Sequence, residues 1–189
     1  MQHQILAVDK ACTPDRWIDV ETAVNLVFRG HITQFLGEER FKLRGGTNAR
    51  TGQPSVLELG SIAIIKADAF LVKDFHWAPA PTRQMLFKRD RHLCAYCGQV
   101  FNDDDLDAEH IHPESRGGIW DWMNLVSSCR ACNTRKSNQT PAEAGMKLLY
   151  LPYRPSRFES LILSNRDILA DQMELLLQRV PKSSRLLLQ

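Results

Sequence analysis

The sequence predicts a mixed α+β protein, and three observations carry this prediction. Short β-prone runs alternate with segments whose apolar residues recur at helical spacing. Two Cys-x-x-Cys pairs lie in the second half of the chain, where a metal ion could hold a small domain together. A proline-rich stretch, residues 78–82 (APAPT), precedes these cysteines and is typical of a linker. We therefore expect a small α+β region followed by a domain that a bound metal ion stabilises.

The N-terminal region begins with a strand and a helix. Residues 4–8 (QILAV) form a β-prone run followed by a polar turn, which predicts a first strand. Asp19 is a suitable N-cap for a helix over residues 20–29, where Val and Phe recur at helical spacing. Gly30 then supplies a C-terminal stop.

The rest of this region is less well defined by its sequence. Short apolar runs occupy residues 32–36 and 40–43. Residues 44–55 (RGGTNARTGQPS) concentrate Gly, Thr, Asn and Pro, which predicts a loop. Residues 56–65 are mostly apolar and fit either a strand or a helix. We expect residues 1–80 to form an N-terminal α+β region, which is a candidate for target recognition.

The second half of the chain predicts one domain over residues 81–150. Residues 83–91 (RQMLFKRDR) indicate a short helix that leads into the first cysteine pair. Residues 140–143 combine a capping Thr, a Pro at the first helical position and a Glu at the third. They predict a helix that runs to about Leu149.

Residues 151–189 are expected to form a C-terminal helical extension. Ser164 with Asp167 makes a suitable cap for a helix that ends before Pro181. The leucines of residues 175–177 need an apolar surface to pack on. That surface is either the core of this chain, which we favour, or the interface with a second copy or a partner protein.

Composition gives no sign of a membrane segment or of secretion. No run of 18 apolar residues is present, so no segment is expected to span a bilayer. The N-terminus lacks the basic start and the apolar core of a secretory signal, which makes a cytoplasmic location the expectation. The net charge of +2 is too small to identify a nucleic-acid-binding protein by itself. On charge alone, the basic clusters at residues 83–92 and 130–136 are those of an ordinary solvated surface.

Four of the five cysteines form the two pairs, Cys94 with Cys97 and Cys129 with Cys132. In a cytoplasmic chain, paired Cys-x-x-Cys units indicate zinc rather than disulfides. Two such turns complete a tetrahedral site of four thiolates, the closed arrangement of structural Zn²⁺. A redox pair would explain one motif but not the second. Because thiolates fill every position of such a site, substrate chemistry must take place elsewhere.

The residues between and around the cysteine pairs form a dense motif. They read LDAEHIHPESRGG at 106–118, WMNLV at 122–126 and CRACNTRK at 129–136. This pattern resembles the signature of the HNH endonucleases, in which an acidic-His pair, a later Asn and a final His or Asn surround one divalent metal. The N-terminal region is more loosely similar to the longer enzymes of this family in bacteria and phages, and residues 140–149 (TPAEAGMKLL) resemble the tail of the same nuclease domain. The resemblance implies a ββα-metal (His-Me finger) core and hydrolysis of phosphodiester bonds in DNA.

The resemblance also implies roles for individual residues. His110 matches the general base, and a neutral imidazole can take up a proton near pH 7. Glu109 and Asn133 match the ligands of the catalytic ion, and their oxygens suit Mg²⁺ or Mn²⁺. Asn133 stands where the family's name has His, and this form retains an oxygen ligand. Asn124 matches the middle residue, whose expected role is a hydrogen bond that holds the backbone of His110. The candidate phosphate contacts are Arg116, Arg135 and Lys136.

Two functions of different classes fit this sequence. The first is a metal-dependent HNH endonuclease that cleaves DNA with His110 as the general base. The alternative is a non-catalytic four-cysteine zinc module that binds nucleic acid or protein, which would need only the cysteines and a basic face. Such a module has no reason to keep the acidic residue, the His and the two Asn residues in register, so the motif favours the enzyme. A nuclease directed at RNA, or a nicking subunit that needs a partner, is also consistent with the sequence.

Overall fold

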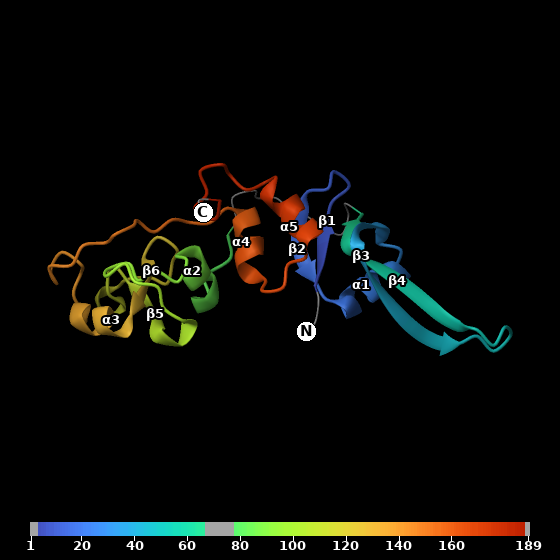
Figure 1. Cartoon of the computed structure of the whole chain (residues 1–189), viewed down its shortest axis with the longest axis horizontal. Helices are drawn as coiled ribbons and strands as arrows, with labels where there is room; N and C mark the ends of the chain where they lie inside the picture. The colour runs from blue at the N-terminus through green and yellow to red at the C-terminus, as the bar shows by residue number, and fades with distance from the viewer. Residues whose placement is uncertain (1–3, 67–77, 188–189) are drawn as a thin grey trace. The chain divides into compact units, whose positions relative to one another are not determined.

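The computed structural model describes residues 4–66 and 78–187. These residues form two compact units, one made of residues 4–66 with 165–180 and the other of residues 78–164 with 181–187. Each unit combines helices with β-strands, so the predicted α+β class is confirmed (Figure 1). Within the described residues, none of the helices has both the length and the apolar character needed to cross a bilayer.

The first unit is built on a four-stranded sheet in the order β2-β1-β4-β3. Its strands are β1 (Ile5–Val8), β2 (Pro14–Ile18), β3 (Ile32–Thr47) and β4 (Pro54–Ile65). β1 pairs antiparallel with β2 and parallel with β4, while β3 pairs antiparallel with β4. The strand predicted at residues 4–8 is therefore confirmed, and residues 56–65 belong to a strand rather than to a helix.

The helix α1 (Val20–Phe28) lies where the spacing of apolar residues predicts it. Oδ1 of Asp19 accepts a hydrogen bond from the backbone N–H of Thr22 at 2.7 Å, which satisfies a donor that the helix start leaves open. Gly30 follows the helix with a φ of 68°, a conformation that suits glycine. The buried core beside the helix and the sheet consists of Ile5, Ala7, Ile18, Ala23, Leu59, Ala63 and Ile65.

The hairpin of β3 and β4 is longer than the sequence predicts. Its ladder continues from the pair Arg40–Gly60 to the pair Thr47–Pro54, which leaves only residues 48–53 as the connecting turn. The predicted loop over residues 44–55 is therefore wrong at both ends. Glycine and threonine at the strand ends resemble a loop in composition, but Thr47 still pairs with Pro54 across the ladder, beyond a shift of register at the two glycines.

Residues 165–180 return to the first unit and carry the helix α5 (Ala170–Leu177). The side-chain amide of Gln172 donates to the carbonyl oxygens of Gln4 at 2.9 Å and Ser61 at 2.7 Å. The predicted helix start at Ser164 is wrong. That residue ends a separate helix, and Gln172 itself supplies the cap of α5 by accepting from the backbone N–H of Leu169 at 3.0 Å.

The second unit contains a two-stranded antiparallel sheet that continues directly into a helix. Its elements are α2 (Arg83–Arg89), β5 (Leu106–His110), β6 (Leu125–Cys129), α3 (Arg130–Lys136) and α4 (Arg157–Ser164), with the 3-10 turns η2 (Asp103–Asp105) and η3 (Glu114–Arg116). The short helix predicted over residues 83–91 is confirmed as α2. Its buried core comprises Met85, Leu86, Phe87, Leu106, Trp122, Leu125 and Leu163.

Residues 140–149 do not form the predicted helix. The capping hydrogen bonds are present, because Thr140 N–H donates to Oε2 of Glu143 at 2.8 Å and Glu143 N–H donates to Oγ1 of Thr140 at 3.3 Å. The chain nevertheless leaves the helical path after one turn, at Gly145, whose φ is 60°. Residues 151–189, expected as one extension, are divided between the two units.

Candidate functional site

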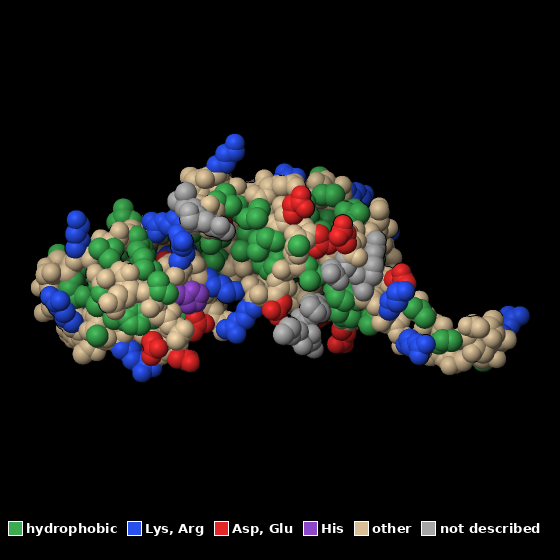
Figure 2. Space-filling view, viewed as in Figure 1, with side chains coloured by type: hydrophobic (Ala, Val, Ile, Leu, Met, Phe, Trp, Pro, Cys, Tyr) green, Lys and Arg blue, Asp and Glu red, His purple; other side chains and the backbone are tan. Residues whose placement is uncertain are grey.

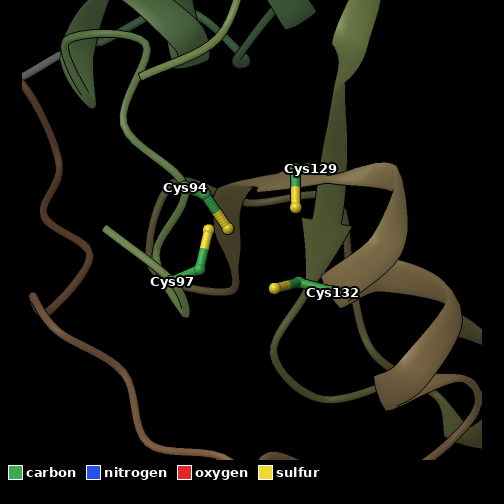
Figure 3. Close-up of side chains that lie close together, drawn as sticks. All are labelled: Cys94, Cys97, Cys129 and Cys132. Atoms are coloured by element: carbon green, nitrogen blue, oxygen red, sulfur yellow. The ribbon is translucent and has the colours of Figure 1, made fainter. Parts of the chain in front are cut away.

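Four cysteines of the second unit lie close together (Figure 3). Cys94 and Cys97 come from the turn after α2, whereas Cys129 ends β6 and Cys132 lies in α3. Their sulfur atoms all lie within 4.8 Å of one another. Among the described residues this is the one group of three or more His, Cys, Asp or Glu side chains that could hold a metal ion. Four converging sulfurs fit a closed structural zinc site.

The electrostatics of this cluster also favour a cation. Burial opposes ionisation of the Cys94 thiol, but backbone N–H groups of Cys97 and Cys129 act on its sulfur and lower the pKa of Cys94 to about 7. Burial and the neighbouring sulfurs raise the pKa of Cys132. Four adjacent thiolates repel one another unless a positive charge lies among them, so the cluster needs a divalent ion to ionise fully.

One face of β5 is directed at α3. Nδ2 of Asn133 donates to Oδ2 of Asp107 at 3.2 Å, and Nζ of Lys136 donates to Oε1 of Glu109 at 2.5 Å. The two acidic residues are two positions apart in the strand, so they project from the same side of it. Asn133 and Lys136 are three positions apart in the helix and likewise share one side. The carboxylates of the strand therefore lie against the polar side of the helix.

The ion pair between Glu109 and Lys136 is almost closed to solvent. The side chain of Lys136 has no exposed surface, and that of Glu109 is 11% exposed. This position corrects the expectation that Lys136 contacts a phosphate, because a buried ammonium ion that already pairs with a carboxylate cannot reach the DNA backbone. Its observed contact is with Glu109.

His110 is the last residue of β5 and stands opposite Leu125 of β6 in the ladder. Its imidazole packs edge-on against the ring of Trp120, with centroids 5.6 Å apart and an interplanar angle of 65°. Trp120 is itself held by a 2.7 Å hydrogen bond from Nε1 to the carbonyl oxygen of Pro81. The loop between β5 and β6 thus fixes one side of the imidazole, which is half-buried.

The side chain of Asn124 crosses the loop that follows His110. Its Oδ1 accepts from the backbone N–H of His112 at 2.8 Å, and its Nδ2 donates to the carbonyl oxygens of His112 at 3.1 Å and Ile119 at 3.0 Å. Its own carbonyl oxygen accepts from the N–H of Ile111 at 2.8 Å. Three of these four hydrogen bonds therefore hold the backbone directly after His110, and the fourth ties it to the far side of the loop.

The same loop turns back so tightly that only glycine fits at position 118. A Cβ atom there would lie 1.8 Å from the carbonyl oxygen of His112, a backbone atom that cannot swing aside. Gly117 precedes it with a φ of 90°, and ends η3 in the left-handed region.

The remaining two predicted phosphate contacts are exposed. Nη1 of Arg116 pairs with Oε2 of Glu143 at 2.5 Å, and both side chains are close to half exposed. The backbone N–H of Thr140 and this guanidinium lower the pKa of Glu143. Arg135 lies on the exposed side of α3.

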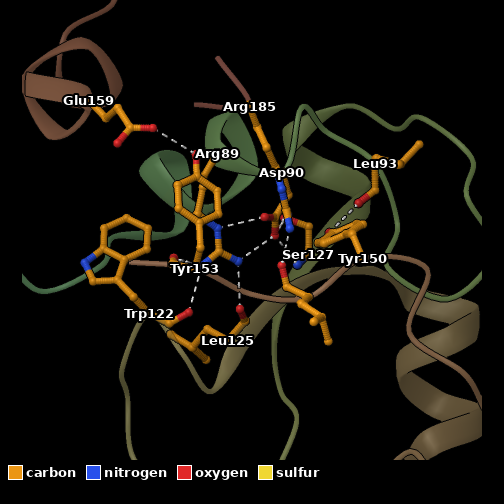
Figure 4. Close-up of polar contacts among 11 residues, drawn as sticks. Arg89, Asp90, Leu93, Trp122, Leu125, Ser127, Tyr150, Tyr153, Glu159 and Arg185 are labelled. Carbon is orange, nitrogen blue, oxygen red and sulfur yellow. Dashed lines mark hydrogen bonds and ion pairs between the residues drawn. The ribbon is translucent and has the colours of Figure 1, made fainter. Parts of the chain in front are cut away.

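A buried pair that sequence reasoning missed lies beneath this loop (Figure 4). Arg89 and Asp90, at the end of α2, are both fully buried and pair at 2.8 Å. The Arg89 guanidinium also donates to the carbonyl oxygens of Trp122 at 2.7 Å and Leu125 at 2.8 Å, which flank Asn124. A further bond, 3.0 Å long, goes to the carbonyl oxygen of Tyr153.

Asp90 extends this network into β6. Its Oδ2 accepts from the backbone N–H of Ser127 at 2.8 Å and from the hydroxyl of Ser127 at 3.0 Å. The predicted basic surface over residues 83–92 therefore includes one arginine that is not on the surface. An Arg-Asp dipeptide at a helix end is common, so the sequence carries no signal that distinguishes this pair.

Comparison with known proteins points to one family. Residues 94–149 match the family model described as HNH endonuclease. A stretch of 65 residues is 40% identical to the CRISPR-associated endonuclease Cas9 of Campylobacter jejuni, and it covers 31% of this chain and 7% of that protein. The likeness is therefore confined to a small part of a much larger relative.

Proposed function

We propose that this protein is a metal-dependent endonuclease that hydrolyses phosphodiester bonds in DNA, because residues 94–149 match the family model described as HNH endonuclease. The observation that carries the proposal is the combination of β5, β6 and α3 with His110 at the strand end and Asn124 bonded across the loop beyond it. We propose that these three elements are the ββα-metal core. A non-catalytic zinc module would not need this arrangement.

His110 is the proposed general base. A base near neutral pH can remove a proton from the water that attacks the scissile phosphate. Asn124 fixes the backbone on one side of this residue, and Trp120 limits the rotation of its ring. Such fixed geometry is what aligns a base with its target atom.

Glu109 and Asn133 are the proposed ligands of a catalytic divalent ion. Mg²⁺ or Mn²⁺ bound there would neutralise the charge that develops on the phosphate. Lys136 orients the Glu109 carboxylate through Oε1, and the hydrogen bond from Nδ2 to Asp107 orients the Asn133 amide. Two oxygen ligands leave most of the coordination shell to water and substrate phosphate, as is usual for Mg²⁺.

The four cysteines are proposed to bind structural zinc. Cys129 and Cys132 span the junction of β6 and α3, so a metal bound there fixes the start of the helix that carries Asn133. Of the predicted phosphate contacts, the two exposed arginines, Arg116 and Arg135, remain in the proposal.

The test is cleavage of supercoiled plasmid in Mg²⁺ or Mn²⁺ by the full chain and by His110→Ala. The wild type should convert plasmid to nicked or linear forms, and the variant should lose at least about a hundredfold in rate. His112→Ala is the matched control, since this histidine lies two residues away and its ring contacts the carbonyl oxygen of Arg116 at 3.0 Å. Equal cleavage by wild type and His110→Ala would refute the assigned base. If the wild type and both variants bind DNA but none of them cleaves it, the zinc module would be favoured.

A further inference from the structure

The outer part of the β3–β4 hairpin is a two-stranded ribbon. β1 pairs with β4 only from Ile62 to Ile64. Beyond that point the β3–β4 ladder runs from the pair Arg40–Gly60 to the pair Thr47–Pro54, and no third described strand joins it. A two-stranded hairpin is only marginally stable alone. We call residues 40–57 the ribbon arm; Figure 1 shows it extending beyond the sheet.

The two faces of the ribbon arm differ in character. Phe41 and Leu43 stand opposite Leu59 and Leu57, and these four side chains pack toward the core of their unit. Because side chains alternate along a strand, Lys42 and Arg44 project from the other face. Both are exposed. The apolar face thus anchors the arm, and the basic face is left to solvent.

Positive charge is concentrated in this arm. Residues 40–57 contain four basic residues, Arg40, Lys42, Arg44 and Arg50, and no acidic residue, while Glu58, directly after them, pairs with Lys42 at 3.0 Å. The whole chain carries a net charge of only +2, so the remainder of the chain is net negative. Figure 2 shows Lys and Arg atoms along the arm and at its far end, with Asp and Glu atoms only toward its base.

The tip of the arm is an ordered turn. Oδ1 of Asn48 accepts from the backbone N–H groups of Arg50 at 2.9 Å and Thr51 at 3.3 Å. The N–H of Asn48 donates to the carbonyl oxygen of Gln53 at 2.9 Å, and Gly52 closes the turn with a φ of 66°. An exposed Arg50 on a fixed turn loses little backbone entropy when it binds a ligand.

We propose that the ribbon arm binds the phosphate backbone of duplex DNA, an inference that rests on the proposed function for the identity of the ligand. The major groove of B-DNA is about 12 Å wide and admits a two-stranded β-ribbon. Lysine and arginine that line such a ribbon neutralise phosphates and release counterions, which supplies affinity without reading sequence. The arm would hold DNA that the other unit cleaves.

The test measures binding apart from cleavage. Fluorescence anisotropy with a labelled duplex is recorded on the full chain in the His110→Ala background, over a range of salt concentrations. Neutralising three basic residues of the arm (Lys42→Gln, Arg44→Gln, Arg50→Gln) should weaken binding roughly 10- to 100-fold. It should also reduce the slope of log K against log salt by about 2–3, close to one per lost phosphate contact.

The matched control removes the same charge from exposed positions of the same unit outside the arm. Lys10→Gln, Arg29→Gln and Lys66→Gln are suitable, because all three side chains are exposed. This control should keep the slope within about one unit of the parent. A second arm variant, Arg44→Gln with Arg50→Gln, leaves the 3.0 Å ion pair of Lys42 with Glu58 intact, so loss of that pair cannot account for its weaker binding.

The outcomes separate this inference from the proposed function. Arm variants that bind DNA with the slope of the control would overturn the inference, even if the wild type cleaves plasmid. A wild type that does not cleave, but whose binding depends on the arm, would support the inference and count against the nuclease.

Discussion

Replacing Arg89 with methionine tests whether the buried network beneath the β5–β6 loop supports the proposed site. The side chain is fully buried and donates five hydrogen bonds, two to Asp90 and three to carbonyl oxygens. Methionine retains most of the apolar stem but none of the donors. Asp90 would then be a buried carboxylate without its cation, although Ser127 would still donate to it.

The expected cost follows from this geometry. Removing one partner of a buried ion pair lowers the free energy of unfolding by about 3–5 kcal/mol, because the other charge stays in a medium of low polarity. Arg89→Lys should cost less, since a lysine offers three donors for the positions that five N–H groups now fill. We expect about 1–3 kcal/mol for the acceptors that lysine leaves unpaired.

Hydrogen exchange can localise this effect because the protein has two units. In Arg89→Met, peptides that cover residues 119–129 should exchange roughly 100- to 3,000-fold faster, since each 1.4 kcal/mol is a factor of ten. Peptides of residues 4–18, in the other unit, should keep their wild-type rates. Arg83→Met is a matched control in the same helix, because its 3.3 Å ion pair with Asp107 is at the surface and is worth about 1 kcal/mol or less.

The reasoning is refuted if Arg89→Met accelerates exchange less than about tenfold over residues 119–129. It is equally refuted if both units lose protection alike, because the network lies wholly within one of them. A larger effect of Arg89→Lys than of Arg89→Met would show that the unpaired charge of Asp90 is not the main cost.

Three further outcomes are expected. Stripping zinc with a chelator should abolish the cooperative melting transition of the cysteine-bearing unit, followed by circular dichroism; an unchanged profile would count against structural zinc. Lys136→Met should lower the free energy of unfolding by about 3–5 kcal/mol in a urea titration, and adding Glu109→Gln should restore part of this loss; equal stability of the single and double variants would contradict the buried pair. Gly118→Ala should reduce plasmid cleavage and melting temperature, because its Cβ would meet the carbonyl oxygen of His112, whereas Gly46→Ala, with nothing within 4 Å, should leave the melting temperature near wild type.

Features with a local signature could be predicted from the sequence. The cysteine pairs indicated one metal cluster, and their sulfurs do converge. Asp19 and Gly30 marked the limits of α1, since capping depends on residues within a few positions of each other. Residues 83–91 predicted α2 from their own sequence pattern.

Features that depend on contacts between residues far apart in the sequence could not be predicted from it. Glu109 and Lys136 are 27 positions apart in the sequence, and neither residue type indicates that the two side chains pair. The burial of Arg89 could not be predicted because its partners are backbone carbonyl oxygens, which every residue type carries. Residues 44–55 of the ribbon arm are predicted as a loop because turn-forming residues also occur at paired strand ends, and only the ladder between β3 and β4 distinguishes a loop from a strand here.

Each unit is built from two separate segments of the sequence, and this constrains how the units can form during synthesis. Residues 4–66 emerge first, yet the side chain of Gln172 that joins Gln4 to Ser61 is made more than a hundred residues later. The cysteine-bearing unit likewise includes residues 181–187, where the Ser184 hydroxyl donates to Glu159. Translation of the first two-thirds of this sequence therefore completes neither unit. A ribosome that stalls there would release a chain with two incomplete cores, which is a substrate for chaperones and proteases.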